Sequence, residues 1–238
     1  MSIEVENLTK IYGRQKAIDA VSFTAHPGQI LGFLGPNGAG KSTTMKILSC
    51  FIPPSSGSAR VAGFDVSSNP MEVRQRLGYL PEHNPLYLDM YVREALSFIA
   101  DVHKIRNKHQ RLEEVIELTG LGPEQHKKIG ALSKGYRQRV GIAQVVLHDP
   151  QVLIMDEPTS GLDPNQLVEI RALIKTLGQS KTIVLSTHIM QEAEALCDKV
   201  VIINQGKIIT ENSMYALHTL FPDKTFEQIF IHLTSGGN

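Results

Sequence analysis

The segment GPNGAGKS, Gly35 through Ser42, constrains this chain more than any other. It follows an apolar run at 30–34 that is typical of a buried strand, and it precedes residues 43–48, which favour a helix. A strand, a glycine-rich loop and a helix in this order distinguish a phosphate-binding loop from a chance match. The glycines let the backbone curl until several N–H groups point at one anion, and the helix that begins near Lys41 adds the positive end of its dipole.

The loop therefore predicts a nucleotide site. We expect Lys41 to reach the β- and γ-phosphates and the Ser42 hydroxyl to hold Mg²⁺. A glycine-rich turn without a ligand is the alternative, but the four fixed residues of the motif should occur by chance in roughly one chain of this length in a hundred. The predicted nucleotide-binding residues of the segment are Gly35, Pro36, Asn37, Gly38, Ala39, Gly40, Lys41, Ser42 and Thr43.

Charge balance and cysteine content exclude several classes of protein. The 238 residues include 24 Lys and Arg against 24 Asp and Glu, so no overall basic field is present to bind nucleic acid. The two cysteines, Cys50 and Cys197, lack the spacing of a zinc site and favour two buried thiols in a reducing compartment. No run approaches the roughly 18 apolar residues of a membrane span, and the N-terminus lacks a signal-peptide pattern. We expect a cytoplasmic protein whose membrane role would depend on a partner.

The pattern of apolar residues predicts an α/β fold. Residues 3–8 and 17–23 alternate apolar and polar side chains, which indicates an antiparallel strand pair ahead of the loop. Between residues 92 and 147 only helical patterns occur, so we expect a helical subdomain inserted into a mainly parallel α/β core. The prediction is a single domain over 1–238, with a core at 1–90 and 150–212, a helical lobe at 91–149 and a helical tail at 213–238.

The loop at 83–90 combines turn-forming residues with large apolar side chains. Leu86, Tyr87, Leu88 and Met90 are expected at the surface, where an apolar loop favours a docking role. The alternative is that these side chains pack onto the following helix.

Two adjacent carboxylates follow a buried strand. The run 151–155 is apolar throughout and ends in Asp156 and Glu157. Parallel sheets bind ligands at this edge, and buried carboxylates need partners because burying a charge is costly. A metal ion and an attacking water would supply such partners. His188 follows the next apolar strand, at 182–186, although a histidine there is also an ordinary helix-start residue.

Three weaker signals accompany these motifs. Ser133 and Gly135 precede a helix at 136–147, where free N–H groups offer a second anion site, but such a pair is also a common helix cap. Asp163 before Pro164 is typical of a helix N-cap. Tyr12 ends the first strand, and the strand preference of tyrosine explains it equally well.

Taken in order, these segments resemble the ATP-binding subunit of an ABC transporter over nearly the whole chain. The corresponding segments are 35–42 for the Walker A loop, 152–156 for the Walker B strand, 132–136 for the signature segment, 160–163 for the D-loop and His188 for the switch histidine. Tyr12 has the place of the adenine-stacking aromatic. Residues 78–82 and 132–139 resemble the exporter-type branch that includes the gliding-motility ATP-binding subunit.

This resemblance implies ATP and Mg²⁺ as ligands and assigns roles to the site residues. Glu157 would be the general base, and His188 would contact the γ-phosphate. Asp156 would hold Mg²⁺ with Ser42, and Glu82, where many members have Gln, would add a charge near the ion. Asp163 would couple two sites.

The resemblance also implies a head-to-tail dimer of two ATP-binding subunits, which we expect to be copies of this chain. Ser133 and Gly135 of one copy would face the γ-phosphate held by Lys41 of the other. Lys134 and Tyr136 replace a Gly and a Gln of the family signature, which leaves the ribose contacts open. The dimer would drive separate integral membrane permease subunits from the inner face of the cell membrane.

Two other functions remain open from the sequence. A soluble ABC-type ATPase acting on the ribosome or on DNA usually has two cassettes with a basic linker, or a long coiled coil, and this chain has neither pattern. A regulatory module without hydrolysis is disfavoured by the intact Glu157 and His188.

Overall fold

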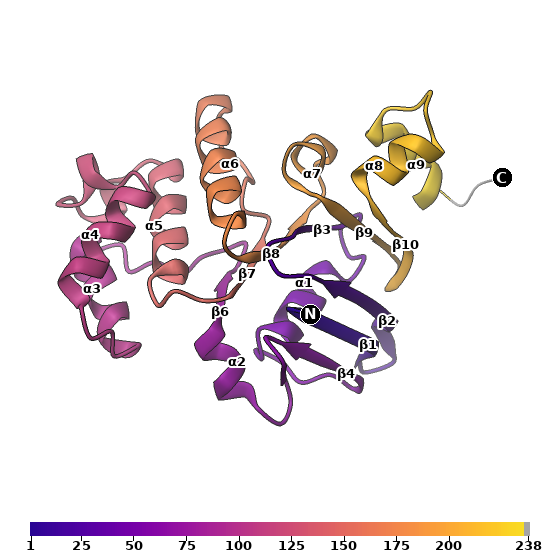
Figure 1. Cartoon of the computed structure of the whole chain (residues 1–238), viewed down its shortest axis with the longest axis horizontal. Helices are drawn as coiled ribbons and strands as arrows, with labels where there is room; N and C mark the ends of the chain where they lie inside the picture. Colours follow the sequence, from indigo (N-terminus) through magenta and orange to yellow (C-terminus); the bar gives the residue numbers. More distant parts are fainter. Residues whose placement is uncertain (236–238) are drawn as a thin grey trace.

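The computed structural model describes residues 1–235 and contains two sheets and a helical lobe (Figure 1). The strands are β1 (Ile3–Tyr12), β2 (Gln15–Ala25), β3 (Ile30–Leu34), β4 (Ser56–Val61), β5 (Phe64–Asp65), β6 (Leu77–Leu80), β7 (Val152–Asp156), β8 (Thr182–Thr187), β9 (Lys199–Asn204) and β10 (Lys207–Ser213). The α-helices are α1 (Lys41–Leu48), α2 (Pro70–Arg76), α3 (Val92–Val102), α4 (Lys108–Leu118), α5 (Lys134–Val146), α6 (Pro164–Gly178), α7 (Met190–Leu196), α8 (Met214–Leu220) and α9 (Phe226–Thr234). Short 3₁₀ turns lie at Gly122–Glu124 and Ile129–Ala131.

The larger sheet brings three strand ends to one edge. Its strands follow the order β10-β9-β3-β8-β7-β6, and all except β10 run parallel to their neighbours. Strands β3, β7 and β8 are buried along their whole length, which explains their continuous apolar runs. The pairs Leu34 with Thr187 and Asp156 with Ser186 set the carboxyl ends of these strands side by side. This is the edge where parallel sheets bind ligands.

The smaller sheet is antiparallel, in the order β2-β1-β4-β5. Its inward side chains, such as Val5 and Phe23, share a core with Phe33 of β3 and Met45 of α1. Helix α1 contacts β2, β4 and β7 and so lies between the two sheets (Figure 1). The predicted antiparallel pair ahead of the phosphate loop is confirmed, and this pair anchors the loop at the junction of the sheets.

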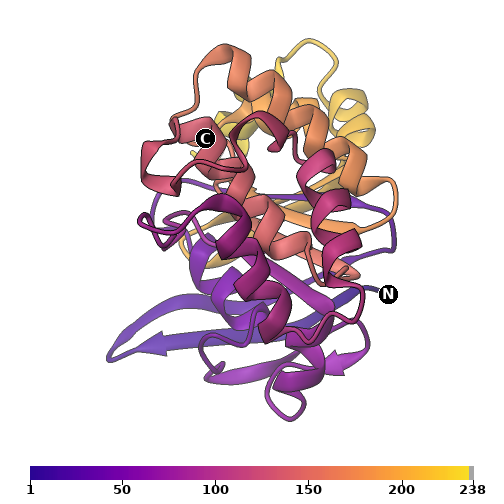
Figure 2. The ribbon, with the colours of Figure 1, turned by 90° about the vertical axis from the view of Figure 1, so that its left-hand side faces the viewer.

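Helices α3, α4 and α5 form a lobe at one end of the molecule, opposite α8 and α9 (Figure 1). Figure 2 looks onto this lobe, with the antiparallel sheet below it. Its core contains Leu96, Val115 and Ile116, and the prediction that residues 92–147 form helices without a strand is confirmed. Within residues 1–235, no helix has both the length and the apolar character that crossing a membrane requires.

Several boundaries differ from the sequence-based expectation. Helix α5 begins two residues early, because the Ser133 side chain accepts a hydrogen bond from the Tyr136 N–H at 3.3 Å and caps the helix at Lys134. Strand β8 extends to Thr187, so His188 follows it directly. Cys197 is buried as expected, but Cys50 is only half-buried, because it follows α1 in a left-handed turn at the surface. The expected tail at 213–238 contains α8 and α9, and its last three residues lie outside the described residues.

The loop at 83–90 combines both expected behaviours. Leu86 and Met90 pack against the core of the lobe. Tyr87 and Leu88 are exposed by 61% and 51%, and the Tyr87 ring meets Phe98 edge-on. The loop is therefore fixed by two apolar side chains and leaves two others exposed at the surface.

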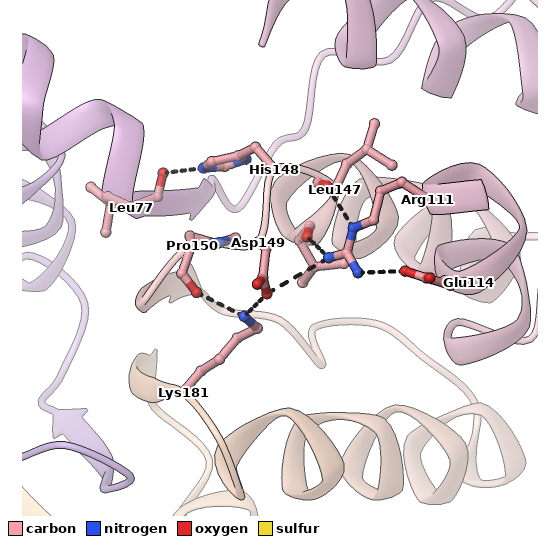
Figure 3. A network of polar contacts seen from close by, with 9 residues as sticks. Leu77, Arg111, Glu114, Leu147, His148, Asp149, Pro150 and Lys181 are labelled. Atoms are coloured by element: carbon pink, nitrogen blue, oxygen red, sulfur yellow. Dashed lines mark hydrogen bonds and ion pairs between the residues drawn. The ribbon is translucent and has the colours of Figure 1, made fainter. Parts of the chain in front are cut away.

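A polar network fastens the lobe to the core where α5 ends (Figure 3). Arg111 of α4 donates to the carbonyls of Val146 and Leu147, both at 2.8 Å, and so satisfies the free C-terminal carbonyls of α5. Lys181, ahead of β8, donates to Asp149 at 2.6 Å and to the carbonyl of Pro150 at 2.8 Å. The network fixes both sides of the turn that leads from α5 into β7.

His148 lies in the same turn as a half-buried imidazole. Its Nε2 donates to the carbonyl of Leu77 at 3.1 Å, whereas its Nδ1 is buried and has no hydrogen-bond partner among residues 1–235. The ring stacks on that of His103 with centroids 4.1 Å apart. Burial lowers the pKa of His148 to about 4, and the nearby charges of His103 and Lys181 act in the same direction. The hydrogen bond to Leu77 and the Asp149 carboxylate raise the pKa, but by less.

The depressed pKa of His148 predicts a loss of stability in acid. Between pH 6.5 and about 4 the unfolded chain binds a proton that the folded chain does not, so acidification through this window favours unfolding. We expect the free energy of unfolding, measured with urea at pH 7 and at pH 4.5, to fall more for the wild type than for His148→Gln. Equal losses in the two chains would show that His148 is not the group responsible.

Candidate nucleotide-binding site

The loop between β3 and α1 has the shape of an anion cradle. Gly38 has a φ of 79° and Gly40 a φ of 110°, which are left-handed values that disfavour other residues. Gly35 is required for another reason, because a Cβ there would overlap the backbone carbonyl of Ile203 in β9. Helix α1 begins at Lys41 directly after the loop, so its free N–H groups face the loop.

Lys41 is buried at the centre of the loop. Its Nζ donates to the carbonyls of Gly35 at 2.7 Å and Pro36 at 3.2 Å, and it lies 3.9 Å from Oε1 of Glu157. Burial lowers the pKa of Lys41, although the carboxylates of Glu157, Asp156 and Glu82 act in the opposite direction. The ammonium is therefore incompletely compensated, and an anion in the loop would stabilise its charge.

The two carboxylates at the end of β7 have different surroundings. Asp156 is buried and accepts a hydrogen bond from the Ser186 hydroxyl of β8. Glu157 is 7% exposed and has a φ of 52°, a left-handed value for a residue with a side chain. Its N–H donates to the carbonyl and the hydroxyl of Ser186 at 3.1 and 3.2 Å.

The carboxylate of Glu157 has one occupied and one free oxygen. Nδ1 of His188 donates to Oε1 at 2.9 Å, while Oε2 is buried with no hydrogen-bond partner recorded in residues 1–235. A buried acceptor without a donor costs free energy. A water molecule or another polar ligand beside Oε2 would remove this cost.

These groups surround one cavity of about 320 Å³. Its walls are formed by Gln15, Ala17, Asn37, Gly38, Gly40, Lys41, Ser42, Thr43, Glu82, Glu157 and His188. The structure thus brings together most of the loop, both predicted catalytic residues and Glu82, from segments far apart in the sequence. Gly35, Pro36 and Ala39 do not line the cavity, and the carbonyls of Gly35 and Pro36 bind Lys41 instead.

Gln15 and Ala17 were not identified from the sequence. Both lie at the start of β2, and Gln15 pairs with Tyr12 across the hairpin. Tyr12 itself is 49% exposed and does not line the cavity, but this pairing sets it beside the cavity wall. Two strand residues after a tight turn carry no signal of their own, since only the pairing of β1 with β2 brings them to the loop.

Ser133, Gly135 and Asp163 lie outside the cavity. Ser133 is the exposed N-cap of α5, and Asp163 is the exposed N-cap of α6, as expected, accepting from Asn165 and Gln166 at 3.1 and 3.0 Å. Gly135 is buried against the Gln166 side chain. In this chain, only Ser133 of the two predicted signature contacts is exposed.

The donor atoms of the site suit Mg²⁺ shared with a phosphate. No group of three or more His, Cys, Asp and Glu side chains that could hold a metal occurs among the described residues. Mg²⁺ in nucleotide sites takes one or two carboxylates, a hydroxyl, waters and phosphate oxygens. Ser42 and Glu82 at the cavity, with Asp156 at the end of the adjoining strand, offer that set.

The fold and the site define a nucleoside triphosphatase of the phosphate-loop class. Residues 18–160 match the family model described as ABC transporter, and the chain belongs to this family. It is an ABC transporter ATPase, the ATP-binding motor subunit of such a transporter.

Relatives of known name support this membership. The bacitracin transport ATP-binding protein BcrA of Bacillus licheniformis is 42% identical over 211 residues, which cover 88% of this chain and 69% of the relative. The linearmycin resistance ATP-binding protein LnrL of Bacillus subtilis is 35% identical over 210 residues, covering 87% of this chain and 68% of the relative.

Solved structures show the same fold. A structure described as the ATP binding subunit of an ABC transporter covers 98% of this chain and 99% of its own with a TM-score of 0.88 and 27% identity. A dimeric post-hydrolysis state of an ATP-binding cassette, bound to ADP and Pi, covers 89% of this chain and 98% of its own with a TM-score of 0.80. At 23% identity, the second likeness shows the fold alone.

The two reasons for glycine in the loop can be separated by substitution. In Gly38→Ala the new Cβ meets nothing within 4 Å, so only the left-handed backbone is strained, by about 1 kcal/mol. In Gly35→Ala the Cβ overlaps backbone that cannot move aside, and we expect a loss of about 3 kcal/mol. Urea unfolding without nucleotide measures both, and equal losses would contradict the close contact at Gly35.

Proposed function

We propose that this chain is the ATP-hydrolysing subunit of an exporter, which dimerises head to tail with a second copy and drives separate integral membrane permease subunits. The observation that carries the proposal is the division of the site. Lys41 and Glu157 meet at one cavity, whereas the exposed Ser133 lies outside it. A second copy would supply Ser133 to the open side of the cavity.

Within one chain, the contacts of Glu157 support the role of general base. Its Oε2 is free to accept a proton from an attacking water, and His188 holds Oε1. His188, half-exposed at the cavity, would also contact the γ-phosphate. Lys41 would leave the loop carbonyls and bind the β- and γ-phosphates. Carbonyl and phosphate oxygens both accept hydrogen bonds, but the phosphate oxygens are charged and so bind the ammonium more strongly.

The remaining residues would bind and orient the nucleotide. The loop from Gly35 to Thr43 would hold the phosphates through its backbone N–H groups, which every residue of it except Pro36 carries, and Tyr12 would stack on the adenine. Ser42, Asp156 and Glu82 would hold Mg²⁺, which supplies neutralisation of phosphate charge. Asp163, beside the signature helix α5, would couple the two sites of the dimer, and Ser133 with Gly135 would face the γ-phosphate of the other copy.

An apolar groove of about 630 Å³ supports a permease partner. Its walls come from the loop at 83–85, from α3 through Ile99 and from the core through Leu77 and Tyr79. It separates the nucleotide-binding core from the helical lobe, so a helix seated there would respond when the two move. We place the protein in the cytoplasm, at the inner face of the cell membrane.

The names of the relatives support export over other functions. One relative is named for bacitracin transport and the other for linearmycin resistance. Neither name refers to gliding motility, which stays a prediction from the sequence resemblance. Nothing observed in residues 1–235 favours the alternative of a soluble ATPase that acts on the ribosome.

Glu157→Gln tests the catalytic role and the dimer together. Without the carboxylate base we expect ATP hydrolysis to fall by about 10²- to 10⁴-fold, while ATP binding persists and dimers accumulate on a sizing column with ATP and Mg²⁺. Glu117→Gln, an exposed position on α4, is the matched control and should hydrolyse ATP at the wild-type rate. A Glu157→Gln chain that stays monomeric with ATP and Mg²⁺ would count against the dimer, and one that hydrolyses normally would exclude Glu157 as the base.

Lys41→Ala tests the phosphate contact. Loss of a charge-assisted hydrogen bond of about 1.5–3 kcal/mol should weaken ATP binding by roughly 10- to 100-fold. Fluorescence titration with a labelled ATP analogue measures this, and Lys175→Ala on the exposed side of α6 should bind as the wild type does. An unchanged dissociation constant for Lys41→Ala would remove Lys41 from its role.

A further inference from the structure

Gln138 makes a hydrogen bond next to the proposed base that the sequence motifs do not account for. It lies on α5, about one turn beyond the cap at Ser133, and its Nε2 donates to the carbonyl of Pro158 at 2.7 Å. The direction of the bond is fixed by chemistry, because a carbonyl only accepts and the side-chain amide has one donor group. Pro158 is buried and directly follows Glu157.

The backbone at Glu157 needs support from outside its own strand. Its left-handed φ of 52° is disfavoured for a residue with a side chain by about 1–2 kcal/mol. On the N-terminal side, two hydrogen bonds to Ser186 of β8 hold the Glu157 N–H. On the C-terminal side the chain has left the strand, so sheet pairing does not hold it.

On this side the Glu157 carbonyl accepts a hydrogen bond from the Ser160 N–H at 3.2 Å within the turn, and Gln138 of α5 adds a hydrogen bond from outside the turn. Pro158 has no N–H and a φ fixed by its ring, so its carbonyl is its one hydrogen-bonding group. The bond from Gln138 is the one recorded for that carbonyl within residues 1–235. With the carbonyl held, only the ψ angles of Glu157 and Pro158 remain free between it and the Glu157 Cα. The bond therefore restricts the direction in which the Glu157 carboxylate leaves the backbone.

Other contacts between α5 and this segment do not reach the same point. The Lys134 side chain lies over Gly161, and Gly135 lies against Gln166 of α6. Gly161 and Gln166 are farther along the chain from Glu157 than Pro158 is. Neither of these two contacts is a hydrogen bond. Gln138 itself does not line the nucleotide cavity, so it has no route to the phosphates.

We propose that Gln138 is a positioning residue, which orients the Glu157 carboxylate toward the attacking water by holding the Pro158 carbonyl. The proposal rests on the proposed role of Glu157 as the base. It gives α5 a function within its own chain, besides the contact that its first turn would make with a second copy.

Substitution of Gln138 tests this with kinetics. Gln138→Met keeps the length of the side chain and removes the donor, and we expect kcat for ATP hydrolysis to fall on the order of 10- to 100-fold, because a small misplacement of a catalytic group costs that much. KM and the dissociation constant for ATP should stay within about twofold, since the phosphate contacts are untouched. Gln138→Lys restores a donor and should recover most of kcat. Gln110→Met, which removes a surface amide of α4, is the control and should match the wild type.

A double substitution separates this proposal from that for Glu157. If Gln138 acts through Glu157, then Gln138→Met should cause no further loss of rate in a chain that already has Glu157→Gln. A further loss of the same size as in the wild type would overturn the proposal, as would wild-type kcat in Gln138→Met alone. A fall in ATP affinity equal to the fall in kcat would also overturn it, because it would indicate general damage to the fold. If instead Glu157→Gln hydrolyses ATP normally, the assignment of the base fails first.

Discussion

The buried contact between Lys41 and Glu157 is the interaction on which the rest of the site depends. The ammonium lies 3.9 Å from Oε1 at the carboxyl edge of the parallel sheet, and the Lys41 residue is only 6% exposed. Burying two opposite charges costs desolvation free energy unless their remaining hydrogen-bond donors and acceptors also find partners. In this chain the carbonyls of Gly35 and Pro36 accept hydrogen bonds from the Lys41 ammonium, and His188 donates to one carboxylate oxygen of Glu157. The free Oε2 and the lowered pKa of Lys41 mark where a ligand completes the balance.

Most of the fold follows from patterns that are local in the sequence. Fully apolar runs predict β3, β7 and β8, because a parallel strand is covered on both faces. The cap at Asp163 with Pro164 fixes the start of α6 to the residue. The phosphate loop, Glu157 and His188 could be proposed from sequence because each stands within two residues of the end of a predicted strand, and parallel strands end at one edge.

The parts that sequence did not predict depend on pairing between distant segments. Gln15 reaches the cavity only through the pairing of β1 with β2. Gly135 is buried because α6 sets Gln166 over it, and the contact of Gln138 with Pro158 joins two segments that carry no local pattern for each other. Cys50 is half-buried rather than buried because the turn after α1 runs along the surface. Burial set by packing of elements cannot be derived from periodicity within one element.

The central claim is that ATP is enclosed by two chains, with the loop of one and Ser133 of the other. Two defective chains test it most directly, both with Glu157→Gln to prevent turnover, one with Lys41→Ala and the other with Ser133→Arg. Mixed in equal amounts, they can build one complete site per dimer, from the loop of the second and the signature helix of the first. The account predicts that the mixture retains one ATP per two chains on a sizing column, whereas neither chain alone retains any. A mixture that retains no ATP, or a Ser133→Arg chain that traps ATP by itself, would contradict it.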